Sequence, residues 1–147
     1  MGNAMQDCLF VGLSDSIDPI LATTLTWYLT LICSGFSCSF WSLNTSMFPD
    51  FLTIFTTILD LFGGSSGSIF GSQMTLYQGL TSTRPDAYGS LLRQGSAAIL
   101  NSYTSRSYPY TPFQVKSQFR SALVSQQAAA VMAVNFENAN HGYSRRN

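Results

Sequence analysis

The chain has 147 residues, enough for one domain with a core of its own. Only 10% of the residues are charged, and seven basic side chains balance seven acidic ones, so the sequence predicts no binding of nucleic acid, which depends on Lys and Arg neutralising phosphates. The polar surface must then come from Ser, Thr, Asn, Gln and Tyr, a composition that is common in secreted and wall-associated proteins and argues against a crowded cytosol.

Residues 1–40 form an apolar N-terminal segment, in which Pro19 to Cys33 is the most membrane-like run. This run of about 15 residues holds four threonines and is shorter than the roughly 20 apolar residues that span a bilayer. No Lys or Arg precedes it, although a basic start is the usual first part of a signal peptide. Three interpretations stay open: a helix buried in the fold or covered by a partner, an atypical signal or membrane anchor within residues 19–41, and a mispredicted, non-native start.

The three cysteines are Cys8, Cys33 and Cys38, and an odd number leaves at least one outside an internal disulfide. Cys33 and Cys38 are five residues apart and could close a small loop in an oxidising compartment; the alternative is a pair of buried thiols. The chain has no CxxC motif and one histidine, so we expect no metal site. Asn44 begins the one N-glycosylation sequon, which matters if the chain enters the secretory pathway.

A second apolar run, residues 51–62, repeats its apolar side chains at the helical spacing i, i+3, i+4, i+7. Asp50 precedes the run in the place of an N-cap and Gly63 follows it in the place of a C-cap, so we predict a helix here. Four β-branched residues weaken its propensity: Thr53, Ile54, Thr56 and Thr57. The Gly- and Ser-rich residues 63–68 then predict a loop or flexible linker.

The next helix is expected to have Pro85 in its first turn and Asp86 complementing the helix dipole. One face is apolar or small: Tyr88, Leu91, Leu92, Gly95, Ala98, Ile99 and Tyr103. Gly95 and Ala98 on that face permit the close approach of another helix. A Gly in a helix costs about 1 kcal/mol relative to Ala, so packing should compensate.

Two more helices complete the expected bundle. Thr111 and Gln114 form a capping box around Pro112, and the helix that they start continues through Leu123. Ser125 caps the last helix, Gln126 to Asn140, which Gly142 ends. Its expected buried stripe is Ala129, Met132, Phe136 and Ala139. The sequence thus predicts an all-α bundle of about four helices over residues 41–143, followed by a tail at 144–147.

We expect no catalytic or cofactor-binding residues. His141 is the one route to a nucleophilic triad, but it lies beside a helix end and is expected to be a solvated side chain. No G-x-S-x-G motif occurs, and the Gly-rich residues 63–71 lack the Lys-Ser/Thr ending of a phosphate loop. Arg84, Asp86 and Arg93 lie near one helix start and could form a polar network, because Arg pairs bidentately with a carboxylate; the alternative is plain surface charge.

Six of the seven tyrosines lie in the second half of the chain: Tyr77, Tyr88, Tyr103, Tyr108, Tyr110 and Tyr143. In a secreted wall protein such residues can be cross-linked or can stack on sugars. The plainer interpretation puts Tyr88 and Tyr103 in the core and the others on an amphipathic surface.

Residues 83–102 contain a dense series of distinctive positions: Thr83-Arg84, Asp86, Tyr88-Gly89, Leu91, Arg93, Gly95, Ala97-Ala98 and Leu100-Asn101-Ser102. Looser positions lie on both sides: Cys38 with Phe40-Trp41, Leu61-Phe62-Gly63, Gln78-Gly79-Leu80, Thr111, Gln114-Val115, Phe119, Phe136 and Ala139-Asn140. On these residues the chain from Trp41 onward resembles the C-terminal domain of the plant protodermal factor family.

That resemblance implies a non-enzymatic protein of the epidermal cell layer, extracellular or in the cell wall, without a cofactor. Its helical domain would mediate association with wall polymers or other wall proteins. The family also has a signal peptide and a proline-rich region, whereas this chain has five prolines in all. The alternative is a membrane-anchored protein, held by residues 19–41 with the helical domain exposed.

Overall fold

The computed structural model describes residues 37–146. In chain order the helices are α3 (Cys38–Leu43), the 3-10 turn η2 (Thr45–Met47), α4 (Ile58–Phe62), α5 (Ser66–Phe70), α6 (Leu76–Leu80), α7 (Ala87–Thr104), α8 (Pro112–Ala122) and α9 (Gln126–Arg146). The predicted all-α class is confirmed, with more and shorter helices before α7 than the sequence suggested. Among the described helices, none has the length and apolarity needed to cross a membrane.

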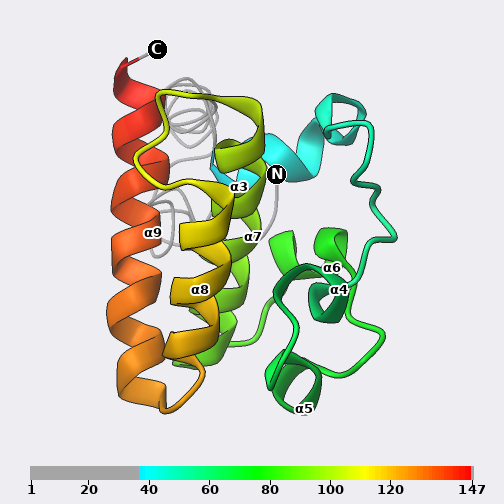
Figure 1. Cartoon of the computed structure of the whole chain (residues 1–147), viewed down its shortest axis with the longest axis vertical. Helices are drawn as coiled ribbons and strands as arrows, with labels where there is room; N and C mark the ends of the chain where they lie inside the picture. The colour runs from blue at the N-terminus through cyan, green and yellow to red at the C-terminus, as the bar shows by residue number, and fades with distance from the viewer. Residues whose placement is uncertain (1–36, 147) are drawn as a thin grey trace, which may run out of the picture.

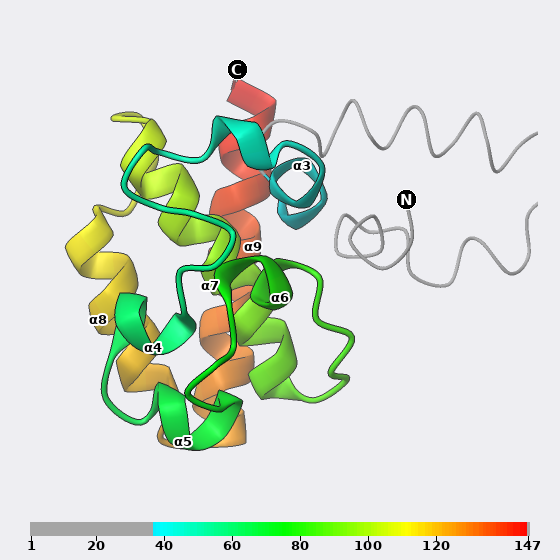
Figure 2. The same ribbon diagram turned by 90° about the vertical axis from the view of Figure 1, so that its right-hand side faces the viewer.

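The long helices α7, α8 and α9 lie side by side, and the short helices α3 to α6 lie on the other side of α7 (Figure 1). Helix α7 is central because it contacts α3, α6, α8 and α9. The view in Figure 2 shows the same arrangement from the side of the short helices. The core therefore forms around α7 and has no separate centre among the short helices.

Helix α7 is buried on more sides than its predicted apolar face. Asp86 is its N-cap and accepts a hydrogen bond from the Gly89 N–H at 2.9 Å, so Pro85 lies before the helix and not in its first turn. Beyond the predicted face, the buried residues include Gln94, Ser96, Ala97, Leu100 and Asn101. Burial on nearly all sides is expected for a helix at the centre of a fold.

The start of α8 is the prediction that the structure confirms in most detail. The Thr111 hydroxyl accepts from the Gln114 N–H at 3.2 Å, and the Thr111 N–H donates to Gln114 Oε1 at 2.9 Å. Pro112 is the first helical residue. About two turns further along the helix, on its core face, the Phe119 ring lies directly over Gly95 of α7, where an added Cβ would come within 2.5 Å of a ring carbon. The predicted packing role of Gly95 is therefore confirmed.

Helix α9 begins as predicted but does not end at Gly142. The Ser125 hydroxyl accepts from the Ala128 N–H at 3.0 Å, and the helix continues to Arg146, which makes residues 144–146 helical and not a tail. A single Gly costs only about 1 kcal/mol in a helix, so packing along the rest of α9 can outweigh it. Of the predicted stripe, Ala129 and Phe136 are buried, whereas Met132 and Ala139 are half-buried.

The predicted helix over residues 51–62 is wrong for its first half. Helix α4 starts at Ile58 with Thr57 as its N-cap, and Asp50 caps nothing described as a helix. The Thr56 hydroxyl accepts from the Thr53 N–H at 2.9 Å, a local bond that competes with helical pairing. An antiparallel bridge between Thr57 and Thr75 also draws this stretch into an extended conformation. The helix end at Gly63, with φ +66°, is confirmed.

The expected linker at residues 63–68 instead leads into helix α5. Gly63 and Gly64 adopt positive φ angles of 66° and 57°, which other residues rarely tolerate, and so make the tight turn. The Ser66 hydroxyl donates to the Gly63 carbonyl at 2.7 Å. Ser66 and Phe70 are buried, so this stretch is part of the packed domain.

Candidate functional site

Arg84 and Asp86 form a bidentate ion pair just before α7. Arg84 Nε donates to Asp86 Oδ1 at 2.7 Å and Nη2 donates to Oδ2 at 2.9 Å. Gln126 of α9 donates to the same carboxylate at 3.1 Å. The hydrogen bonds from Arg84, with smaller contributions from Gln126 and the Gly89 N–H, lower the pKa of Asp86 from 3.8 to about 2. The carboxylate therefore ties the start of α7 to the start of α9.

The guanidinium of Arg84 also reaches α5. Its Nη1 donates to the Ile69 carbonyl at 3.2 Å, and its Cζ lies 5.8 Å from the centre of the Phe70 ring and 5.7 Å from that of Tyr88. Both distances are within the range of cation–π attraction. One side chain thus holds the connection before α7 against α5.

Arg93 binds the backbone of the same connection. Its Nη1 donates to the Arg84 carbonyl at 2.8 Å and to the Ser82 carbonyl at 3.1 Å. Gly89 lets the backbone of Arg84 lie close against α7, because a Cβ at position 89 would collide with the Arg84 carbonyl. The structure therefore brings Arg84, Asp86 and Arg93 together as a network that fixes residues 82–86 on α7.

A second polar chain, which the sequence analysis did not foresee, runs through the core. Trp41 Nε1 donates to Asn101 Oδ1 at 2.8 Å, and Asn101 Nδ2 donates to Asn140 Oδ1 at 2.8 Å. The Tyr108 hydroxyl donates to the same Asn140 oxygen at 2.7 Å. Asn140 Nδ2 then donates to Gln94 Oε1 at 3.0 Å. All five side chains are buried, so the chain joins α3, α7, α9 and the loop before α8 from inside.

Burial of Tyr108 raises the pKa of its hydroxyl far above the ordinary value of 10. This tyrosine is a neutral donor in the core, so its expected place on the surface is wrong. The sequence spacing could have indicated that these polar residues are buried. Gln94 and Asn101 are seven residues apart on α7, and Asn140 follows the buried Phe136 by four, so they share helix faces with apolar residues. Polar residues in register with an apolar face indicate a buried network when each has a partner.

Of the other expected sites, Cys33 and Cys8 lie outside the described residues. The Cys38 thiol is buried and donates to the Arg93 carbonyl at 3.2 Å, and its disulfide with Cys33 stays a prediction. Asn44 is half-buried at the end of α3, and its Nδ2 donates to the Phe40 carbonyl at 2.8 Å. Glycosylation there also stays a prediction.

The solvated side chain expected for His141 is wrong. The residue is half-buried, and its Nε2 is shielded from solvent without a hydrogen-bond partner among residues 37–146. In that same part of the chain, His, Cys, Asp and Glu form no group of three or more that could hold a metal ion.

Several large apolar side chains are exposed on the surface of the domain. From the last residue of α3 to the stretch before α4 they recur every four residues, at Leu43, Met47, Phe51 and Phe55, the last of which is 75% exposed. The buried residues Phe48 and Leu52 alternate with them and hold this segment on the core. Exposed apolar side chains that gather into a contiguous patch are typical of a contact surface.

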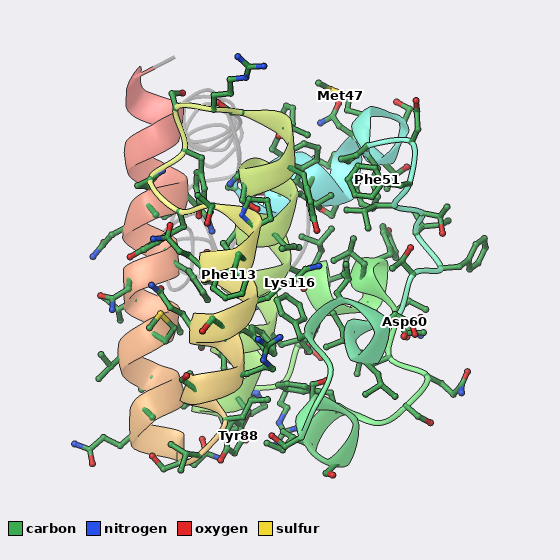
Figure 3. The ribbon with its side chains drawn as sticks, viewed as in Figure 1. Met47, Phe51, Asp60, Tyr88, Phe113 and Lys116 are labelled. Atoms are coloured by element: carbon green, nitrogen blue, oxygen red, sulfur yellow. The ribbon has the colours of Figure 1, made fainter. Side chains whose placement is uncertain are left out.

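Beside this segment, aromatic and basic side chains meet on one face. The Phe51 ring lies 4.9 Å from that of Tyr103 in an edge-on arrangement, and the Lys116 ammonium lies 5.5 Å from the Tyr103 ring centre. Figure 3 shows Phe113 next to Lys116 over α8, and Arg120 follows one turn later on the same helix. We call Phe51, Tyr103, Phe113, Lys116 and Arg120 the aromatic–basic band.

Comparison with known proteins identifies the family. Residues 37–147 match the family model described as the protodermal factor 1 C-terminal domain. The chain is 36% identical over 110 residues to protodermal factor 1 of Arabidopsis thaliana, an alignment that covers 72% of this chain and 36% of that protein. The match therefore spans about a third of the relative's length, and no solved structure matches the chain. The chain belongs to the protodermal factor 1 family and contains its C-terminal domain.

Proposed function

We propose that this chain is a non-enzymatic interaction protein of the plant epidermis, located outside the cell and associated with the wall. Its helical domain would bind wall polymers or other wall proteins through its outer face. The observation that carries this proposal is the group of exposed apolar side chains between α3 and α4, where Phe51 is 64% exposed. Such exposure is costly in water unless a partner covers it.

The arrangement of the two polar networks supports a role as a rigid platform. Hydrogen bonds of both networks join helices to one another: those of the Arg84–Asp86 pair and those of the buried chain through Asn140. Side chains that are engaged in this way hold the helices in fixed positions, which is what a platform for binding requires. Family membership supports the epidermal setting, because the relative is named a protodermal factor.

The test of location is expression of the full chain with a C-terminal tag in plant epidermal cells. Wall, membrane and soluble fractions are separated, and the N-terminus of the recovered protein is sequenced. Recovery from the wall with a start near Cys33 to Cys38 is the expected result. The same tag on a cytosolic protein is the control, and recovery of our chain beside that control in the soluble fraction would contradict the proposal.

The sequon offers an independent check of passage through the secretory pathway. If Asn44 carries a glycan, a glycosidase lowers the apparent mass of the recovered protein, and Asn44→Gln removes that shift. Asn44→Asp, which also removes the acceptor amide, should behave in the same way. Asn44→Asp removes the donor of the hydrogen bond to the Phe40 carbonyl, and Asn44→Gln moves the amide by one methylene group, so both variants are first compared with the wild type for thermal stability.

The second candidate function is a membrane-anchored protein with the helical domain exposed. It is favoured by the apolar run from Pro19 to Cys33, which precedes the domain in the sequence. In the same fractionation, an intact N-terminus in the membrane fraction, released by detergent and not by salt, would favour this candidate over the wall.

A further inference from the structure

The aromatic–basic band combines ring faces with positive charge. Phe113 is 75% exposed and Phe51 is 64% exposed. Helix α8 contributes Lys116 and Arg120 and contains no Asp or Glu, and Asp60 of the adjoining α4 forms no ion pair with either of them among residues 37–146. A ligand that covers the band must therefore present flat apolar surface together with negative charge.

We propose that the band binds an acidic polysaccharide, a polymer of uronic acid sugars. A pyranose ring has a face of C–H groups, whose partial positive charge suits the negative face of an aromatic ring. Each uronic acid also carries a carboxylate, which pairs with an ammonium or a guanidinium. This inference rests on the proposed function, because it names the class of wall polymer and the surface that binds it.

The two cations keep donors for such a ligand. Lys116 lies over the Tyr103 ring, and an ammonium has three N–H groups, so those directed away from the ring are available. Arg120 is exposed and donates from Nη1 to the Phe62 carbonyl at 3.2 Å, and its other N–H groups make no hydrogen bond within residues 37–146. Residues four apart on a helix lie about 6 Å apart, so the two cations can meet carboxylates on one polymer.

The exposure of the rings favours a sugar polymer over a peptide. Peptides that bind as helices or strands need a groove or an open sheet edge. The rings of Phe113 on α8 and of Phe51 are open to solvent, and the half-buried Tyr103 lies beside Phe51 and Lys116. An extended polymer with flat rings can lie along such a surface and contact Phe51 and Phe113 in turn.

Affinity electrophoresis of the full chain in native gels tests this proposal. Gels contain polygalacturonic acid or, as the uncharged counterpart, a neutral galactan, and the loss of mobility gives the apparent Kd. The double variant Lys116→Gln with Arg120→Gln should bind polygalacturonic acid on the order of tenfold more weakly, as two screened charge contacts predict. Phe113→Ala should weaken binding about threefold, and Lys116→Arg should retain it.

Two matched control variants distinguish binding at the band from an effect of net charge and from nonspecific apolar contact. Arg106→Gln removes the same charge as Arg120→Gln at an exposed position in the loop after α7, and should change the Kd by less than about twofold. Val131→Ala shortens an exposed apolar side chain in the shallow groove between α8 and α9, and should change nothing. Thermal unfolding checks that each variant is folded.

Equal losses for Arg106→Gln and Arg120→Gln, or no loss in the double variant, would overturn the inference. Equal retention by the neutral galactan would also overturn it, because charge would then play no part, while wall association itself would stand. Failure of both polymers to retain a chain that is nevertheless recovered from the wall would point to a protein partner. Failure of both together with absence from the wall would overturn the proposed function as well.

Discussion

Helix α7 and the segment between α3 and α4 are neighbours, yet they use apolar side chains in opposite ways. Leu91, Leu92 and Ile99 of α7 are fully buried, whereas Phe51 and Phe55 of the segment are mostly exposed. The helix uses its side chains for stability. The segment uses Phe48 and Leu52 to hold its place and leaves the others outside. The contrast separates residues that maintain the fold from those available to a partner, and the two groups should respond differently to substitution.

The largest effect is expected for Asn140→Ala, which removes the centre of the buried polar chain. Asn101 and Tyr108 each lose the hydrogen bond that they donate to Asn140, and Gln94 loses the one that it accepts, all inside the core. Buried polar groups deprived of a partner cost about 1–3 kcal/mol each, so the free energy of unfolding should fall by roughly 3–5 kcal/mol. Urea denaturation measures it. Asn138→Ala, exposed on the same helix, should change it by less than about 0.5 kcal/mol, and similar losses for both would contradict the role of the chain.

Gly95→Ala should destabilise the protein by about 2 kcal/mol, even though Ala is the better helix former by about 1 kcal/mol. The added methyl group would lie within 2.5 Å of the Phe119 ring, which is itself stacked on Phe62 at 3.8 Å. Phe119→Leu in the same background should recover part of the loss. A double-mutant cycle with no coupling between the two sites would show that the contact is not the cause.

Asp86→Asn should cost about 1 kcal/mol, because Asn can still cap α7 but cannot form the ion pair. The side chains of Arg84 and Asp86 are 38% and 33% exposed, so solvent screening limits the effect. The pKa of Asp86 is lowered from 3.8 to about 2 in the folded state, so its contribution is complete above pH 4 and is lost as the pH falls toward 2. Unfolding free energies measured across that range should fall less steeply in Asp86→Asn. Parallel curves would exclude this linkage.

The smallest effect is expected within the exposed segment. Phe55→Ala should change the free energy of unfolding by less than about 0.5 kcal/mol, because the ring is 75% exposed. Leu52→Ala, three residues away and buried, should cost about 2–3 kcal/mol. Thermal and urea unfolding of the pair give the comparison. A large loss in Phe55→Ala would mean that the segment contributes to stability and is not available for contact.

Sequence reasoning succeeded where the signal was local. The capping box of Thr111 and Gln114 depends on residues three apart, and the start of α9 depends on Ser125 alone. It failed at residues 51–57 because their apolar spacing competes with threonine side chains that bond to nearby backbone, and with the distant pairing of Thr57 and Thr75.

Among the candidate sites, too, the local contacts could be predicted from the sequence and the distant ones could not. Arg84, Asp86 and Arg93 lie within ten residues, so their proximity could be foreseen, although the contact of Arg93 with backbone carbonyls could not. The chain from Trp41 to Asn140 joins residues 39 and 60 positions apart, which only tertiary packing brings together. The band likewise assembles from Phe51, Tyr103 and α8, and no spacing within one element predicts it.

The stacking of Phe119 on Phe62, with Phe70 at 6.0 Å, also has a kinetic consequence. Helices α4 and α5 have five residues each, and helices so short are not stable alone in water. Their order depends on a ring contributed by α8. Amide protons of α4 and α5 should therefore exchange with deuterium whenever Phe119 leaves its place, and their protection sets an upper limit on how often α8 separates from the rest of the molecule.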